Sequence, residues 1–369
     1  MKTKAAGTPL TPSFSHCLLT LAHRAPSYPR FLQKGWERLS AGISGFPAFR
    51  LEAGESMGHG AFLRRVCIVL MALAAVTLTA QEPITTLHVD VRLVSIFVNV
   101  TDKNGALVGG LTKDDFAIYE DNRPQEIAVF ERQSELPLNL TLAIDTSGSV
   151  RKDLSEEAGA ARRFAHAILR PQDQMSVLQF ATEVTELTPF TNKLSVIDRR
   201  LGELHSDFAT ALYDAICLGS EKLGGRDGRK VLVVISDGDD TVKNSTYAQA
   251  LEAALRNEVM IYSIIDVPIE ASAGRDLGGE HALITLAEQT GGKYFYVSDG
   301  GLDKAFAKVS DDLRTQYLIG YYPHHQVPGT NFHRLTVTIP RAAPDEFNVR
   351  NKTGYYADAP PSSRRMPVE

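Results

Sequence analysis

The chain has 369 residues, of which 43% are hydrophobic and 22% are charged, and its formal net charge is -5. This length and hydrophobic content allow a sizeable core and favour two domains over one. The chain has no basic excess with which to neutralise a phosphate backbone, which argues against a nucleic-acid partner.

A signal for export lies near the start of the chain. Arg64 and Arg65 precede an unbroken apolar run at residues 66–80, and Ala80 offers a small residue for cleavage. This order is typical of a secretory signal peptide, and the run is shorter than the roughly 20 residues that a membrane-spanning helix needs. We predict a signal peptide at 57–80 and an exported protein that is periplasmic, on the cell surface or secreted. The alternative is an uncleaved signal, which would give the only expected contact with a membrane.

Residues 1–56 precede this signal and show no sustained periodicity, whereas Met57 stands at the usual distance before the two arginines. We therefore predict that translation starts at Met57, with Met1 as the alternative. Residues 1–56 are then a non-native or disordered leader.

The three cysteines are Cys17, Cys67 and Cys217, and only Cys217 would remain after processing. A disulfide within the mature chain and a metal centre built from cysteines are therefore excluded. Cys217 lies in an expected amphipathic helix, where packing is its simplest role.

The segment 86–133 has strand character. Residues 88–100 alternate apolar and polar side chains, and a turn at 102–105 predicts a β-hairpin there. Two further short strands are expected at 116–120 and 127–130, separated by a polar turn.

The segment 137–318 alternates short apolar runs with helical patterns, which predicts an α/β domain whose mostly parallel, doubly wound sheet is covered on both faces. The expected strands are 138–144, 175–180, 231–235, 259–265 and 293–297. The expected helices are 154–169, 193–205, 210–223, 247–256, 281–288 and 302–316.

Strand patterns return over residues 319–357, and residues 358–369 read as a disordered tail. Because strands stand on both sides of the α/β segment, we expect the N-terminal and C-terminal strands to pair into one small β-sandwich. The α/β domain would then be an insertion in that sandwich.

Oxygen-bearing side chains follow two of the expected strands. Asp145, Ser147 and Ser149 come directly after the strand 138–144, Asp237 follows the strand 231–235, and Thr210 opens a helix between them. Ligand sites in open α/β sheets form beyond the carboxyl ends of the strands, so these side chains can converge on one cation. Asp and Ser are also common helix caps, but three such segments in this order favour a metal site. Two hydroxyls with few carboxylates suit Mg²⁺.

Other acidic residues have plainer interpretations. Asp239 and Asp240 could tune the site or bind a second cation, but a solvated loop or a cap of the following helix explains them as well. Asp214 could point toward the loop of Asp237 or cap its helix. Asp311 and Asp312 are expected on a solvated helix face.

The motifs Asp-x-Ser-x-Ser after a strand, Thr in TALYDA and Asp in ISDGDD resemble the metal-ion-dependent adhesion site of von Willebrand factor type A domains. The resemblance covers residues 137–318 and implies that family's Rossmann-like fold. It implies that Ser147, Ser149 and Thr210 contact the metal, that Asp145 and Asp237 act largely through water, and that an acidic group of the partner fills the open position.

The chain as a whole resembles a group of secreted bacterial proteins, common in acidobacteria, that are built around such a domain. It departs from integrins after Ser149, where Val150 and Arg151 replace the paired acidic residues of a neighbouring second metal site. One metal ion is therefore expected in this domain.

The sequence thus predicts a non-enzymatic module that uses one Mg²⁺, with Mn²⁺ or Ca²⁺ as alternatives, to grip an acidic side chain on a protein partner. One alternative is a structural or assembly role in which the metal is incidental. Another is a metal-assisted hydrolase, which is disfavoured because Ser147 and Ser149 lie in no nucleophile elbow and have no obvious His partner.

Overall fold

The computed structural model describes Ile68 and the ranges 93–132, 135–148, 154–267, 277–299, 301–323, 331–343 and 346–358. Residues 88–369 belong to one compact unit. The predicted leader, the signal peptide apart from Ile68, Ser149 and the residues beyond 358 lie outside the described residues. Within the described ranges, no helix combines the length and apolar character needed to cross a membrane.

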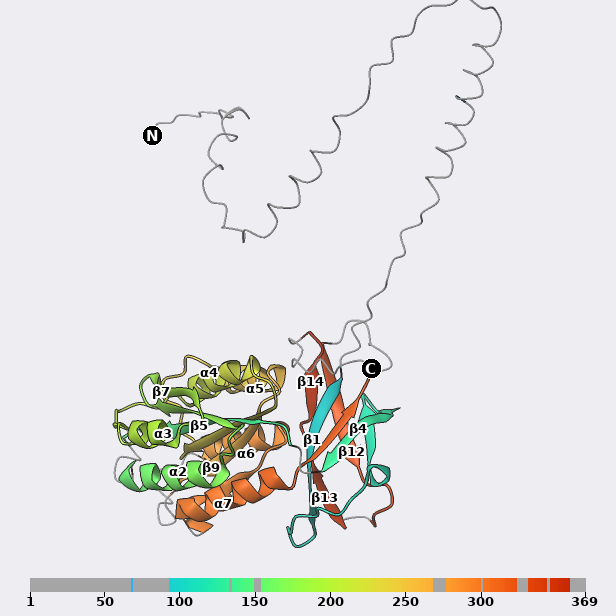
Figure 1. Cartoon of the computed structure of the whole chain (residues 1–369). Coiled ribbons are helices and arrows are strands. Elements are labelled where there is room, and N and C mark those ends of the chain that lie inside the picture. The colour runs from blue at the N-terminus through green and yellow to red at the C-terminus, as the bar shows by residue number, and fades with distance from the viewer. Residues whose placement is uncertain are drawn as a thin grey trace, which may run out of the picture. The chain divides into compact units, whose positions relative to one another are not determined.

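The α/β part is built on a six-stranded sheet with the strand order β10-β9-β8-β5-β6-β7 (Figure 1). Its strands are β5 (Leu138–Asp145), β6 (Gln174–Phe180), β7 (Val184–Thr191), β8 (Arg229–Ser236), β9 (Met260–Ile265) and β10 (Tyr294–Tyr296). All neighbouring strands are parallel except β7, which pairs antiparallel with β6 at the edge. β5, β8 and β9 are buried along their whole length, as expected for strands covered on both faces.

Helices cover both faces of this sheet, which confirms the doubly wound α/β prediction (Figure 1). Alternate residues of β8 point to opposite faces, so Val231 and Val233 belong to one core and Leu232 and Val234 to the other. The first core is completed by α2 (Leu154–Ile168), α3 (Leu194–Leu201) and α7 (Gly301–Arg314). The second is completed by α4 (Leu212–Gly224), α5 (Tyr247–Arg256) and α6 (Leu277–Gln289).

Two four-stranded antiparallel sheets, with the orders β13-β1-β11-β4 and β14-β12-β2-β3, form the flanking β unit. The N-terminal strands are β1 (Val94–Asp102), β2 (Ala117–Glu120), β3 (Arg123–Gln125) and β4 (Ile127–Arg132). The C-terminal strands are β11 (Tyr317–Tyr321), β12 (Phe332–Thr338), β13 (Phe347–Arg350) and β14 (Gly354–Tyr356). Because each sheet contains strands from both ends of the chain and the two sheets share one core, the predicted sandwich-like unit is confirmed.

The hairpin expected after residue 100 differs from the prediction. The turn forms, with the Gly105 amide donating to the Asp102 carbonyl at 2.9 Å, but the returning chain makes only a single bridge between Thr101 and Leu107. The long-range partners of β1 are β11 and β13 instead. Pairing with the buried C-terminal strands removes more apolar surface from water than a local hairpin would.

A buried polar network joins the α/β part to the β unit, and it contradicts the solvated face expected at Asp312. This side chain lies on α7 and is only 2% exposed. Its carboxylate accepts hydrogen bonds from the Tyr262 hydroxyl of β9 at 2.6 Å and from the Arg350 guanidinium of β13. The expectation holds only for Asp311, which is exposed.

Candidate metal centre

Asp145 is the last residue of β5, and its side chain is completely buried. One carboxylate oxygen accepts the Ser147 amide at 2.9 Å, and the other accepts the Ser236 hydroxyl at 2.7 Å. These two bonds fix the orientation of the carboxylate at the carboxyl end of the sheet.

The charge of Asp145 is poorly compensated by the protein. Burial raises its pKa to about 6, the nearby charge of Asp237 adds to the rise, and the hydrogen bonds from Ser236 and Ser147 only partly oppose it. A cation beside this carboxylate would supply the missing compensation.

Hydrogen bonds hold together the three loops that carry the predicted ligands. The buried Thr210 donates its amide to the Thr241 hydroxyl at 2.8 Å, and its carbonyl accepts the Thr241 amide at 2.9 Å, which ties the start of α4 to the loop after β8. The Asp207 amide donates to the Thr146 carbonyl at 3.1 Å, which ties the same segment to the loop after β5. Buried Ser147 lies in this last loop, whereas Ser149 lies outside the described residues.

The acidic residues of α4 and of the loop after β8 have separate roles. Asp237 is half-buried, and its carboxylate accepts the Asp239 amide at 3.2 Å. Asp240 accepts the Tyr213 amide at 3.3 Å, so it caps the preceding helix α4 rather than the following helix. Asp214 accepts the side-chain amide of Asn244 at 3.1 Å and therefore supports the loop.

Ser236 is the residue of this site that the sequence interpretation missed. Its hydroxyl donates to Asp145 and accepts the Gly238 amide at 3.1 Å, so it connects the ends of β5 and β8. The available signal was a hydroxyl directly after the apolar run 231–235 and directly before Asp237.

The donor set fits a hard divalent cation. The loops carry carboxylate and hydroxyl oxygens from Asp145, Ser147, Thr210 and Asp237, and neither nitrogen nor sulfur side chains belong to the set. Oxygen ligands of this kind are those that Mg²⁺, Mn²⁺ and Ca²⁺ prefer.

Gly238 fixes the position of the loop that carries Asp237, and we expect Gly238→Ala to disturb both stability and metal affinity. Its φ is +100°, and an added Cβ would lie 2.6 Å from the backbone carbon of Gly279 in α6. Gly105→Ala is the control, because Gly105 also has a positive φ, of +82°, but no atom lies within 4 Å of an added Cβ. This control measures the cost of the backbone conformation alone, about 1–2 kcal/mol. Urea denaturation should show a larger loss for Gly238→Ala, and calorimetry with Mg²⁺ should show weaker binding for that variant alone. Equal losses in both measurements would contradict this role for Gly238.

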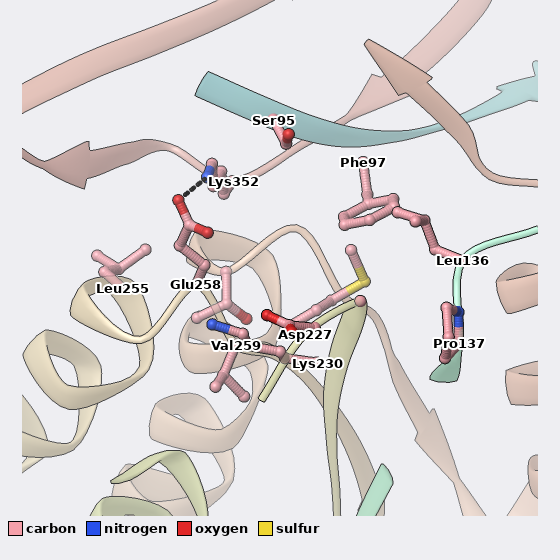
Figure 2. Close-up of a pocket in the computed structure, with 13 residues that line it drawn as sticks. Ser95, Phe97, Leu136, Pro137, Asp227, Lys230, Leu255, Glu258, Val259 and Lys352 are labelled. Atoms are coloured by element: carbon pink, nitrogen blue, oxygen red, sulfur yellow. Dashed lines mark ion pairs between the residues drawn. The ribbon is translucent and has the colours of Figure 1, made fainter. Parts of the chain in front are cut away.

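A separate cavity of about 220 Å³ lies at the opposite, amino-terminal ends of β5, β8 and β9, against β1 (Figure 2). Apolar side chains such as Phe97, Val259 and Met260 line it, and Lys352 and Glu258 form an ion pair of 3.7 Å at its edge. It is smaller than the pockets of roughly 300–1,000 Å³ that usually hold small ligands. We therefore interpret it as part of the joint between the α/β part and the β unit.

Residues 140–239, which include the described metal-centre loops, match the family model of the von Willebrand factor type A domain. No curated protein matches the chain. Among solved structures, BatB from Bacteroides thetaiotaomicron is 20% identical, with 48% of this chain and 97% of that chain covered and a TM-score of 0.40. The vWF domain of the pili tip protein Mfa5 from Porphyromonas gingivalis is 12% identical, with 48% of this chain and 94% of that chain covered and a TM-score of 0.39. A von Willebrand factor type A protein from Catenulispora acidiphila is 12% identical, with 72% and 75% covered and a TM-score of 0.42.

Proposed function

We propose that the chain is an exported bacterial protein that binds a protein partner through one Mg²⁺. Residues 140–239 match the von Willebrand factor type A domain, a kind of domain that often mediates adhesion or protein binding. Mn²⁺ and Ca²⁺ remain the alternative ions. The proposed ligands are Asp145, Ser147, Ser149, Thr210 and Asp237. The observation that carries the proposal is the buried and poorly compensated carboxylate of Asp145, at the point where three oxygen-bearing loops are hydrogen-bonded together.

The proposed partner offers an acidic side chain. A divalent ion held by the proposed ligands would supply the positive charge that attracts a carboxylate of the partner. The hydrogen bond between Ser236 and Asp145 fixes the Asp145 side chain before a ligand binds. Binding therefore costs little conformational entropy at this residue.

The surroundings of the centre favour a partner with apolar residues beside that acidic group. Phe208 is 86% exposed in the segment that leads to Thr210, and Leu277 is 69% exposed at the start of α6, the helix whose Gly279 lies against Gly238. Both side chains could pack against apolar residues of a partner that approaches the centre.

Calorimetry on the metal-free full chain tests the metal. We expect one saturable Mg²⁺ site that Asp145→Ala removes, because the variant lacks the buried charge at its centre. Asp311→Ala is the matched control, since this carboxylate is exposed on α7 and lies outside the candidate centre. Unchanged Mg²⁺ binding in Asp145→Ala would overturn the proposal.

A second measurement separates adhesion from an assembly role with an incidental metal. The probe is a peptide with one Asp between leucines, compared with the same peptide carrying Asn. Adhesion predicts Mg²⁺-dependent binding of the Asp peptide alone. Binding of both peptides, or binding that survives chelation, would instead support the assembly alternative.

A further inference from the structure

The β unit contains a second group of metal-ligating side chains, distant in sequence from the centre described above. Glu120 ends β2, Asp121 begins the turn to β3, and His333 lies on the neighbouring strand β12. The Nδ1 atom of His333 lies 2.8 Å from a carboxylate oxygen of Asp121 and 3.5 Å from one of Glu120. In the described part of the chain, this is the one cluster of His, Cys, Asp or Glu whose ligand atoms all lie within 4.8 Å of one another.

Two members of the cluster, Glu120 and His333, are buried in the β unit, and Asp121 is half-buried at its edge. Glu120 and His333 are 4% and 3% exposed, and the Tyr355 hydroxyl donates to Glu120 at 2.6 Å. Two carboxylates and an imidazole are costly in such a place unless opposite charge compensates them. The imidazole alone supplies at most one positive charge for two negative ones.

An independent observation points to a missing ligand. The hydroxyl of Tyr321, on β11 of the opposite sheet, is fully buried and has no hydrogen-bond partner of normal geometry among the residues that the structure describes. It lies beside Glu120 and Tyr355, near enough to interact with both but without normal hydrogen-bond geometry, and burial together with these two neighbours raises the pKa of Tyr321. Buried polar atoms rarely remain unsatisfied, so a bound group beside the cluster would explain this hydroxyl.

The backbone holds the carboxylates in place. Asp121 and Asn122 have φ values of 48° and 65°, which turn the chain tightly between β2 and β3. The other oxygen of Asp121 accepts the Arg334 amide at 2.9 Å, and the Asp121 amide donates to the Arg334 carbonyl at 2.9 Å. The side chain of Asp121 is 32% exposed, which leaves an entry path from solvent.

We propose that Glu120, Asp121 and His333 bind a Zn²⁺ ion in the β unit, with the Tyr321 hydroxyl or a water beside the fourth position. In a tetrahedral Zn²⁺ site, ligand atoms at about 2.0–2.1 Å from the ion lie roughly 3.3 Å apart, and the two observed separations from Nδ1 lie on either side of this value. The charges of the ion and the two carboxylates then cancel. An imidazole ligand favours Zn²⁺, whereas the all-oxygen centre of the α/β part favours Mg²⁺.

This site connects the β2–β3 turn to β12 and does not depend on the proposed adhesion function. The competing explanation is a metal-free ion pair between His333 and the two carboxylates. The two explanations differ in Zn²⁺ stoichiometry, which can be measured with the other centre disabled.

The test is calorimetric titration of Zn²⁺ into the metal-free full chain carrying Asp145→Ala. We expect adding His333→Gln or Asp121→Asn to remove one Zn²⁺ site per chain. The matched control is His166→Gln, since His166 pairs with the single carboxylate of Asp198 at 3.0 Å on the surface, and this change should leave the stoichiometry as it was. Asp121→Asn guards against misfolding, because Asn tolerates the positive φ and keeps an oxygen for the Arg334 amide. Circular dichroism verifies the fold of each variant.

X-ray absorption at the zinc edge of the Asp145→Ala chain provides an independent signature. We expect one nitrogen and otherwise oxygen ligands near 2.0 Å, and loss of the nitrogen shell in His333→Gln. The proposal is overturned if the chain binds no Zn²⁺, or if His333→Gln and Asp121→Asn both retain the same number of sites as the Asp145→Ala parent.

Discussion

Asp145→Asn should make the metal-free chain more stable at pH 7, by up to about 3 kcal/mol, while abolishing its stabilisation by Mg²⁺. The buried carboxylate has its pKa raised from 3.8 to about 6, chiefly by desolvation, and raising a pKa by one corresponds to about 1.4 kcal/mol. Asn has nearly the same shape and keeps an oxygen for the Ser147 amide or the Ser236 hydroxyl, but it carries no charge that burial must oppose.

The pH dependence of this effect has a definite sign. Because the folded-state pKa of Asp145 lies above its unfolded value, its contribution to stability is fully present below about pH 4 and is lost as the pH rises through about 6. The variant has no such titration. The difference between the two proteins should therefore be small at pH 4 and should reach its full size above pH 6.

Urea denaturation of both proteins in chelator at pH 4, 5, 6 and 7.5 measures this difference, and Mg²⁺ added at pH 7.5 should then raise the midpoint of the natural chain only. Asp237→Asn is a useful comparison, because its carboxylate is only half-buried and should lose Mg²⁺ affinity with a much smaller gain in stability. A variant that is less stable than the natural chain at pH 7.5 without metal would mean that Asp145 is already compensated by the protein.

The order of the ligand motifs along the chain was enough to predict the loops of the candidate centre. Asp145, Thr210 and Asp237 follow or precede elements whose apolar runs are unmistakable, and parallel strands bring their carboxyl ends to one edge. The sequence pattern therefore predicted the doubly wound sheet and the loops of the candidate centre. Asp145 is buried where a core residue would normally be apolar, which is the usual mark of a functional position.

Other features depend on contacts that local patterns do not encode. β7 was missed because half of its residues, VTELTPFT, are polar and because it contains Pro189. The proline is tolerated at this edge because β7 pairs only with β6. Asp240 caps a helix that lies before it in the chain, and only the return of the loop after β8 to α4 brings them together. The Glu120, Asp121 and His333 cluster joins residues more than 200 positions apart, so no spacing rule could have indicated it.

Asp312→Ala should lower the free energy of unfolding by about 3–5 kcal/mol, because it removes one partner of a buried ion pair and leaves the other uncompensated. The side chain of Arg350 is only 17% exposed beside Asp312, and Tyr262 is fully buried with its hydroxyl directed at the same carboxylate. Burial and the charge of Asp312 both raise the pKa of Tyr262, so its hydroxyl stays a donor that needs an acceptor.

Asp311→Ala is the control for this last prediction, since it removes the same carboxylate from the same helix but at an exposed position. Substitutions at such positions usually alter the free energy of unfolding by less than about 0.5 kcal/mol. Urea denaturation followed by circular dichroism compares the two variants. Asp312 joins α7 and β9 of the α/β part to β13 of the β unit, so we expect the variant to unfold in two transitions. If Asp312→Ala and Asp311→Ala unfold alike, the network is dispensable and the two parts must be held together by their apolar contacts around Phe97 and Met260.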